Sequence, residues 1–155
     1  MLFVRETSIG PIAIAVDDTH VTHLHLPRTT AELTGFDEGE TDLAREAFRQ
    51  LELYLDGRLR IFNLPLRPEG TPFMRRVWEK LLEVPYGKTA SYRDIAIAAG
   101  SPKAVRAVGM ANARNPISII IPCHRIIGAS GKLVGYGGGL DLKTRLLELE
   151  ARNAG

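Results

Sequence analysis

Residues 91–114, SYRDIAIAAGSPKAVRAVGMANAR, predict two short helices separated by a tight turn. Ser91 followed three residues later by Asp94 is typical of the capping box that begins a helix, and apolar residues then recur at helical spacing. Gly100 should end this first helix, and Ser101–Pro102 should begin the second helix as its N-cap and first helical residue. Two helices joined by so short a turn indicate a helix-turn-helix.

The second of these helices has two dissimilar faces. The residues that should face the core fall together on a helical wheel, and they are Ala104, Val105, Val108 and Ala111. The opposite face holds Lys103, Arg106 and Arg114, interleaved with Ala107 and Met110 and with Gly109 at its margin. A basic face built on small residues lets a helix backbone approach a phosphate-lined groove closely. A solvated helix surface is the alternative, but such surfaces normally mix Lys with Glu and this face has no acid. The pattern favours nucleic-acid binding.

The charges are unevenly distributed along the 155 residues of the chain. Residues 1–70 contain seven Lys and Arg against twelve Asp and Glu, whereas residues 71–155 contain thirteen against six. A basic half beside an acidic half suggests that the second half meets a polyanion, although an uneven solvated surface would explain the same numbers. The hydrophobic content of 45% and the charged content of 25% are those of an ordinary globular protein.

The N-terminal half has the pattern of a small sheet followed by a helix. Alternation with a period of two predicts strands at residues 2–6, 11–17 and 20–26. Residues 41–57 carry apolar positions at helical spacing. Thr71 then provides the N-cap and Pro72 the first residue of a further helix, which marks a boundary. We therefore predict two domains, at residues 1–70 and 71–155.

Simple features exclude several other classes of protein. His20, His23 and His25 of one predicted strand alternate in direction and have no second cysteine as partner, so solvated histidines are favoured over a metal site. The N-terminus has no signal-peptide pattern, and no apolar run approaches the length that crosses a membrane. A lone cysteine excludes an intrachain disulfide and fits a reducing cytosol. We expect a cytoplasmic protein without membrane contact.

The one cysteine of the chain lies in the stretch IIIPCHRII, residues 119–127. Asn115–Pro116 should stop the preceding helix, and residues 117–121 should form a buried strand that leads to a short loop holding Cys123. Taken alone, such a cysteine is more often an inert apolar residue than a nucleophile. Because neighbouring strand residues point to opposite faces, the adjacent His124 should reach the thiol through a bridging water.

Residues 73–150 resemble the C-terminal domain of the O6-alkylguanine-DNA alkyltransferases. The motifs that carry the resemblance are SYRDIAIAAGSPKAVRAVG, NPISIIIPCHRII, GYGGGL and the closing LLELE. The N-terminal strands and helix resemble more loosely the small ribonuclease-H-like domain of the same family. The resemblance implies an α+β fold, with a ribonuclease-H-like domain followed by a winged-helix-like domain that contains the helix-turn-helix.

The resemblance also implies a reaction and the residues that perform it. An alkyl group would pass from the oxygen of an alkylated guanine to the sulfur of Cys123, a soft nucleophile suited to attack at saturated carbon. His124 matches the base that deprotonates the cysteine through a water, and Glu150 matches the acid that holds this histidine. Asn115 matches a hinge residue that helps to organise the site, and Tyr92 matches the donor of a proton to the base. Glu150 should make an imidazolium–thiolate pair accessible near neutral pH.

Further positions match residues that handle the substrate. Backbone groups of Cys123 and Ile126 match those that contact the exocyclic amine of guanine, and Tyr136 matches the residue that covers the base. Gly137 departs from relatives with a serine at this position, which removes a hydroxyl group. Arg106 matches an arginine that takes the place of the flipped nucleotide. The residues expected to bind DNA are Lys103, Arg106, Ala107, Gly109 and Arg114.

The partner implied by the resemblance is duplex DNA that carries alkylated guanine, with alkylated thymine left open as a second substrate. Nothing in the chain offers chemistry that breaks the resulting thioether, so each molecule should react once. We expect a monomer in solution and leave open that several copies bind along one DNA. No cofactor is expected, and no metal, since the lone cysteine must stay free to react. Arg125 should support the loop rather than perform chemistry, and Lys143 should support the loop or bind phosphate.

Two alternatives belong to other classes. A cysteine hydrolase would use the same residue types, but it would turn over and would leave the basic helix without a purpose. A purely DNA-binding protein, including a lesion sensor related to the alkyltransferases, would not need the thiol that this chain retains.

Overall fold

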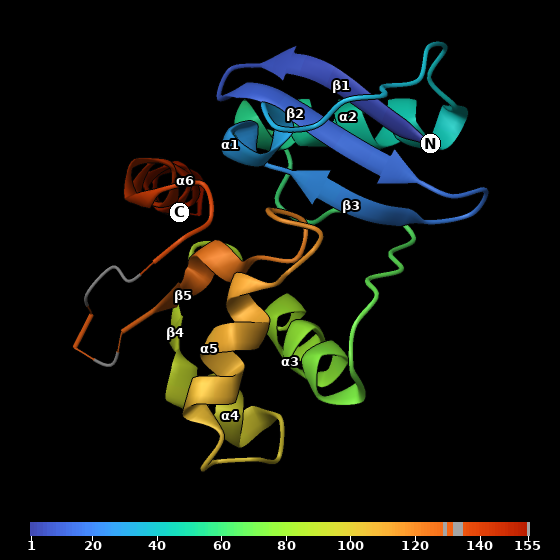
Figure 1. Ribbon diagram of the computed structural model, residues 1–155. Coiled ribbons are helices and arrows are strands. Elements are labelled where there is room, and N and C mark those ends of the chain that lie inside the picture. The colour runs from blue at the N-terminus through green and yellow to red at the C-terminus, as the bar shows by residue number, and fades with distance from the viewer. Residues whose placement is uncertain (129, 132–134, 155) are drawn as a thin grey trace. The chain divides into compact units, whose positions relative to one another are not determined.

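The computed structural model describes residues 1–128, 130–131 and 135–154, which form two compact units of mixed helix and strand (Figure 1). The first unit contains Met1–Pro68 together with Pro116–Ile120, and the second contains Glu69–Asn115 together with Ile121–Gly155. The predicted α+β class is confirmed. Within the described residues, no helix is long and apolar enough to cross a membrane.

An antiparallel sheet of three strands forms the centre of the first unit. In the order in which they pair, the strands are β1 (Leu2–Thr7), β2 (Gly10–Val16) and β3 (Val21–His25), as the alternating pattern predicted. The helix α2 (Asp42–Leu55) lies against this sheet, and the short α1 (Pro27–Thr30) follows β3 (Figure 1). Strand alternation and helical spacing both direct apolar side chains inward. Among the fully buried ones are Ile12, Ile14, Phe48 and Leu51.

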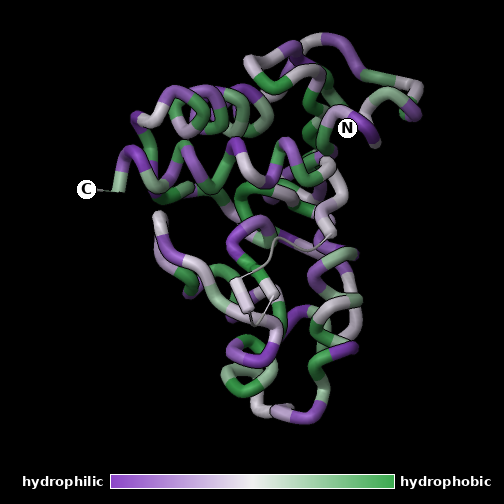
Figure 2. The backbone as a smooth tube through the Cα atoms, turned by 90° about the vertical axis from the view of Figure 1, so that its left-hand side faces the viewer, coloured by the Kyte–Doolittle hydropathy of each residue, from purple (hydrophilic) through white to green (hydrophobic). Residues whose placement is uncertain are grey.

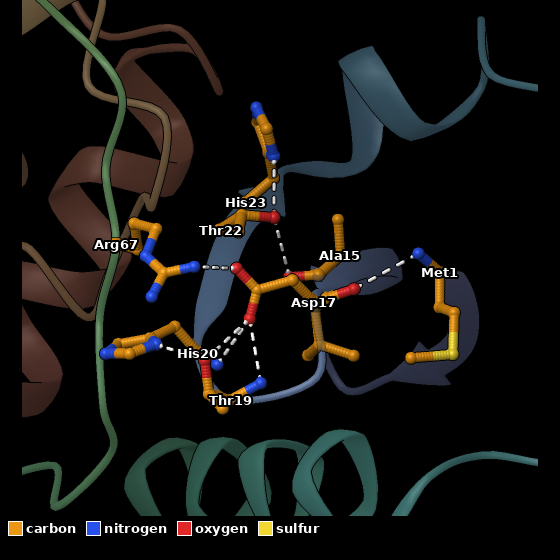
Figure 3. Close-up of polar contacts among 9 residues, drawn as sticks. Met1, Ala15, Asp17, Thr19, His20, Thr22, His23 and Arg67 are labelled. Carbon is orange, nitrogen blue, oxygen red and sulfur yellow. Dashed lines mark hydrogen bonds and ion pairs between the residues drawn. The ribbon is translucent and has the colours of Figure 1, made fainter.

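The turn between β2 and β3 is closed by the carboxylate of Asp17 (Figure 3). This carboxylate accepts hydrogen bonds from Thr19 N at 2.8 Å, His20 N at 2.7 Å and the Arg67 guanidinium at 2.6 Å. The donors favour the charged form, the two backbone groups most of all, and lower the pKa of Asp17 to about 2. Arg67 also donates its backbone N–H to Val21 O at 2.9 Å, so the segment after α2 is held along β3.

The histidines near β3 lie as the strand pattern predicted. The rings of His23 and His25 stack with their centroids 5.4 Å apart, which confirms that they share one face of the strand. His20 lies in the preceding turn, where Nδ1 is 2.7 Å from Thr19 Oγ1. Among the residues that the structure describes, no group of three or more His, Cys, Asp or Glu side chains could hold a metal ion.

The second unit consists of helices and one small sheet. In chain order its elements are α3 (Pro72–Leu82), β4 (Ala90–Ser91), α4 (Tyr92–Ala98), α5 (Val105–Ala113), the 3-10 helix η1 (Cys123–Arg125), β5 (Ile126–Ile127) and α6 (Leu140–Asn153). β4 and β5 pair in parallel. Trp78 of α3 is buried, and its indole N–H donates to Ala111 O on α5 at 2.9 Å. Hydrophobic and hydrophilic residues alternate along the helices, so that one side of each can face this core (Figure 2).

The predicted start of α4 is confirmed. Asp94 N donates to Ser91 Oγ at 3.0 Å, and Ser91 N donates to Asp94 Oδ2 at 2.9 Å, which completes the capping box. Gly100 follows the end of the helix with a φ of 78°, a left-handed conformation that glycine adopts without strain. Thr71 likewise caps α3, since its Oγ1 accepts a hydrogen bond from Met74 N at 3.1 Å.

The predicted start of α5 is wrong. Residues 101–104 form a turn, closed by Ala104 N donating to Ser101 O at 2.9 Å, and the helix begins at Val105. Proline is as favourable at the second position of a β-turn as at the first position of a helix, so Ser101–Pro102 is compatible with both. The later start leaves Val105 38% exposed, although we predicted that it faces the core. Val108 and Ala111 are buried as predicted.

The predicted strand at residues 117–121 is also wrong, although the segment is buried. Ile117 forms an isolated bridge with Leu24, and Ile119 has a φ of 71°, which a continuous strand does not allow. A run of β-branched residues resembles a strand whenever it is buried, and this one lacks a neighbour along its full length. Cys123 consequently lies in η1 and not in an irregular loop after a strand.

Replacing Ser91 by alanine should lower the free energy of unfolding by ~1 kcal/mol, because the Asp94 N–H loses its side-chain acceptor. Ser91→Thr keeps a hydroxyl acceptor and should lose less. Denaturant unfolding of both variants measures the difference. Identical stabilities of wild type and Ser91→Ala would show that the capping box does not stabilise α4.

Candidate active site around Cys123

Cys123 begins η1 and is nearly enclosed, with 5% of its surface exposed. Burial disfavours the thiolate and raises the pKa of the thiol. A hydrogen bond from the Asn115 side chain and the charge of Lys143 act in the opposite direction but do not cancel the effect of burial. Cys123 is therefore a thiol in the resting protein.

His124 is fully buried, and Glu150 fixes the orientation of its ring. Nε2 lies 2.7 Å from Glu150 Oε2. Because a carboxylate can only accept, we assign the ring hydrogen to Nε2, which makes Nδ1 the basic nitrogen of the neutral ring. Burial lowers the pKa of the imidazole more than Glu150 raises it, and Arg125 and Lys143 lower it further. The resting pair is thus a thiol beside a neutral imidazole, and Glu150 acts on the imidazole in the predicted direction, toward the imidazolium.

The carboxylate of Glu150 is the centre of a buried ionic cluster. Its carboxylate also accepts hydrogen bonds from Arg125 Nε at 2.8 Å, Arg125 Nη2 at 3.0 Å and Gly87 N at 3.3 Å. Arg125 donates through Nη1 to Val84 O at 2.8 Å, so it supports the loop as predicted. Since Arg125 already balances the charge of Glu150, this carboxylate has less capacity to stabilise a second cation on His124.

The turn before β4 contributes to the cluster in a way that we did not predict. Gly87 has a φ of 78°, and a Cβ atom there would lie 2.4 Å from the Cβ of Ala154. The backbone can therefore take this path beside α6 only with glycine at this position. The sequence at residues 85–87, Pro-Tyr-Gly, is typical of a turn and was the available signal.

Lys143 of α6 is buried and supports the backbone beside the thiol. Its Nζ donates to Ile126 O at 2.5 Å, which agrees with the prediction that it holds the loop. Burial lowers the pKa of this lysine, whereas charge on Cys123 raises it. Lys143 is thus a source of positive charge close to the sulfur.

Tyr92 and Asn115 also lie near the thiol. Tyr92 begins α4 and is half-buried; burial and then the charge of Cys123 raise the pKa of its hydroxyl. Asn115 follows α5 and donates through Nδ2 to Ile121 O at 2.8 Å, which ties the end of the helix to the chain that enters η1.

Tyr136 and Gly137 lie just before α6. The hydroxyl group of Tyr136 is buried, and burial followed by the charges of Cys123 and Glu150 raises its pKa well above the ordinary value. Gly137 is exposed, and a Cβ atom at this position would meet no atom of the described residues within 4 Å. The two positions that resembled substrate contacts therefore differ in depth, with one hydroxyl enclosed near the sulfur and one glycine exposed.

The basic face that we predicted for the second helix is present on α5 and the turn before it. Its exposed residues are Lys103, Arg106, Ala107, Met110 and Arg114, and Gly109 is half-buried. Small residues between the basic ones keep the helix surface low enough for a phosphate backbone to approach. This face and the cysteine site belong to the same compact unit.

A helix-turn-helix with a basic second helix, combined with a buried cysteine and a histidine held by a glutamate, defines the class as a DNA-binding protein with a candidate cysteine nucleophile. Residues 4–68 match the family model described as 6-O-methylguanine DNA methyltransferase, ribonuclease-like domain, and residues 72–152 match the model described as the DNA binding domain of the same enzyme.

Similar proteins and a solved structure indicate the same family as these models. Over 150 residues, 96% of this chain and 95% of the relative, the chain is 49% identical to the methylated-DNA--protein-cysteine methyltransferase of Methanosarcina barkeri. It is 49% identical over 146 residues, 94% of this chain and 88% of the relative, to the enzyme of the same name from Mycobacterium leprae. A crystal structure of Mycobacterium tuberculosis OGT in complex with DNA superimposes with a TM-score of 0.85 at 42% identity, covering 98% of this chain and 93% of the other.

The chain belongs to the 6-O-methylguanine-DNA methyltransferase family. It is therefore a DNA-repair methyltransferase that acts on DNA, with a ribonuclease-like domain followed by a DNA-binding domain.

Glu150→Gln should lower the free energy of unfolding by ~3 kcal/mol or more, because a neutral amide leaves the buried Arg125 guanidinium without its counter-charge. Glu148→Gln changes an exposed carboxylate on the same helix and should cost less than ~0.5 kcal/mol. Denaturant unfolding of the two variants gives the comparison. Equal losses would contradict the role of the ionic cluster.

The stability of the protein should be greatest between about pH 6.5 and pH 8.5. Below this window, His124 and His25 bind protons in the unfolded chain but not in the folded protein, because burial lowers the pKa values of both in the folded state. Above it the unfolded chain releases the thiol proton that folded Cys123 retains, because burial raises the pKa of this thiol. Each of these differences in proton binding between the folded and unfolded states lowers the free energy of unfolding outside the window. In denaturation at several pH values, Cys123→Ser should reduce the alkaline decline and keep the acid decline; an unchanged alkaline decline would contradict the raised thiol pKa.

Proposed function

We propose that this protein repairs O6-alkylguanine in duplex DNA by moving the alkyl group onto Cys123, once per molecule. The observation that best supports the proposal is the order of groups around the thiol: a buried cysteine, an adjacent buried histidine and a carboxylate 2.7 Å from Nε2 of that ring. The names of the relatives, in which a cysteine of the protein is the methyl acceptor, support the same reaction. Alkylated thymine is a second substrate that the same chemistry accommodates.

The chemical step needs one base and one acid. His124 takes the thiol proton at Nδ1 through a bridging water while the sulfur attacks the alkyl carbon. The carbon–sulfur bond forms as the carbon–oxygen bond breaks, and the electron pair stays on the guanine oxygen. Tyr92 gives its hydroxyl proton to the base, so guanine leaves neutral and Cys123 becomes a thioether. The proton gained by His124 then returns to Tyr92 through solvent.

A resting thiol affects the selectivity of the reaction. A permanent thiolate reacts with many electrophiles, whereas a thiol that is deprotonated only as it attacks reacts where a substrate is held in place. Glu150 stabilises the transient imidazolium because its carboxylate is already bonded to Nε2. Lys143 offsets part of the negative charge that develops on the sulfur.

Backbone groups beside the thiol provide contacts for the base. Cys123 O accepts a hydrogen bond from Ile126 N, and Ile126 O accepts one from Lys143 Nζ. A carbonyl oxygen has two lone pairs, so each of these retains one for the exocyclic amine of guanine. Tyr136 covers the base, and the lack of a side chain at Gly137 leaves room for adducts larger than methyl.

DNA binding rests on the exposed face of α5. The residues of this face that contact DNA are Lys103, Arg106, Ala107, Gly109 and Arg114. The helix enters the minor groove, where its small residues allow close approach, and Arg106 fills the space left by the flipped nucleotide. Flipping the nucleotide out of the duplex costs a few kcal/mol. Stacking of the Arg106 guanidinium in the vacated place offsets part of this cost.

The reaction ends with a stable thioether, so each molecule transfers one alkyl group. A thiol that must stay reduced requires a reducing compartment, and for this reason we place the protein in the cytoplasm. A single copy supplies all groups named above, so the monomer is sufficient, and several copies can bind along one DNA.

Cys123→Ser should abolish alkyl transfer and leave duplex affinity close to that of wild type, because affinity rests on phosphate contacts of the basic face. Intact-mass measurement after incubation with O6-methylguanine duplex should show one added methylene on wild type and none on the variant. Any transfer to the serine variant would refute the assignment of Cys123 as the nucleophile. More than one added group per wild-type molecule would refute single transfer.

Arg106→Ala should slow repair of duplex DNA by ~10-fold or more, and it should barely affect reaction with free O6-alkylguanine base, which needs no flipping. Arg152→Ala removes the same charge from an exposed position of α6 and serves as the control. Single-turnover rates on the two substrates separate the roles. Equal losses on both would mean that Arg106 acts in the pocket and not in the base stack.

A further inference from the structure

Asn112 is a buried polar residue that the mechanism above does not use. It lies on α5 with 6% of its surface exposed. Its side-chain oxygen Oδ1 is buried and has no hydrogen-bond partner among the residues that the structure describes. An unsatisfied buried acceptor is destabilising and needs an explanation.

The position of Asn112 places its side chain beside Tyr92. Gly109, one helical turn earlier on the same face of α5, approaches the Tyr92 ring so closely that a Cβ atom there would lie 3.9 Å from Cε1. Burial and then the charge of Cys123 raise the pKa of the Tyr92 hydroxyl, and the Asn112 side chain acts against this rise, as a hydrogen-bond donor facing the hydroxyl would. Because Oδ1 is without a partner, the amide nitrogen is the group that faces the hydroxyl.

We propose that Asn112 is a positioning residue that keeps Tyr92 a proton donor: its amide N–H donates to the Tyr92 oxygen and thereby directs the hydroxyl hydrogen toward the base. This inference rests on the proposed function, in which Tyr92 protonates the leaving guanine. Asn112 touches neither the sulfur nor the alkyl group in this account. It acts through Tyr92 alone.

The hydroxyl group of a tyrosine has one hydrogen and two lone pairs. When an amide N–H occupies a lone pair, the O–H hydrogen can only be given to another acceptor. When Tyr92 transfers its proton to the base, the same N–H stabilises the phenolate until a proton returns. An amide turned the other way would accept the hydroxyl hydrogen and remove it from the base.

A purely structural role explains the same residue less well. Asparagine is a weak helix former, and an aliphatic side chain of similar volume would fill the space without an unsatisfied oxygen. If the site requires the amide N–H of Asn112 at Tyr92, Oδ1 must point away from the hydroxyl. The unsatisfied oxygen is then the energetic cost of placing the donor there.

The test is a double-mutant cycle on single-turnover transfer from O6-methylguanine duplex. Asn112→Leu keeps the volume and removes the donor, so transfer should slow by ~10-fold. Asn112→Asp puts an acceptor at the hydroxyl and should slow transfer further. In a Tyr92→Phe background neither substitution should add a loss, because the group on which Asn112 acts is already gone. Equal losses in both backgrounds, or no loss in either, would overturn the proposal.

Two further measurements separate a positioning role from a folding defect. Asn112→Leu should raise the pKa of Tyr92, measured as the tyrosine absorbance titration that Tyr92→Phe removes, while its thermal unfolding midpoint stays equal or rises. A lower midpoint with an unshifted titration would overturn the proposal and assign Asn112 to folding.

Failure of the inference and failure of the proposed function give different results. If Tyr92→Phe transfers at the wild-type rate while Cys123→Ser does not transfer, the alkyl-transfer function stands and the Asn112 inference is overturned. If Cys123→Ser still acquires the alkyl group, the proposed function itself fails.

Discussion

The buried carboxylate of Glu150 is the constraint on which the second unit depends. Its two oxygens accept hydrogen bonds from His124, Arg125 and Gly87, which lie on η1 and on the turn before β4. A fully buried ion must be satisfied by all of its donors at once, so the carboxylate fixes α6, η1 and this turn relative to one another. Because Cys123 precedes His124 directly, the geometry of the thiol follows from the same contacts.

The balance of charge in the cluster explains why the site rests in a neutral form. Arg125 compensates Glu150, and burial then outweighs the remaining attraction that a protonated His124 would feel. With Lys143 protonated, the resting site has one positive charge in excess of its negative charges. Transfer of the thiol proton to His124 leaves this total unchanged and puts the new negative charge on the sulfur, where Lys143 offsets part of it.

Local signals in the sequence predicted the fold where a few adjacent residues determine it. The Ser91–Asp94 capping box and the Thr71 cap are such cases, because their hydrogen bonds join residues three apart. The start of α5 was mispredicted because Ser101–Pro102 suits a turn as well as a helix. Residues 117–121 were mispredicted because a strand needs partners that no local pattern reveals.

The site was predictable in its composition and not in its charge state. Motifs identified Cys123, His124 and Glu150, and the structure brings these residues together. The pairing of Arg125 with Glu150 joins residues 25 apart in sequence, and only the folded chain reveals that the carboxylate is shared. Burial raises the pKa of Cys123 and lowers that of His124, and the charge of Arg125 adds to the second effect. Contacts between residues distant in sequence and burial therefore set the protonation state of the site. The residues that compose the site are nearly the same as those that the motifs indicated.

The central claim is that His124 is neutral at rest, with its hydrogen on Nε2. Nitrogen NMR of the histidine rings measures this directly, and the signals of His124 can be assigned by their absence in His124→Gln. At pH 7 the account predicts one protonated and one unprotonated ring nitrogen for His124, with the hydrogen on the nitrogen that faces Glu150. Two protonated nitrogens at pH 7 would mean a resting imidazolium and would contradict it.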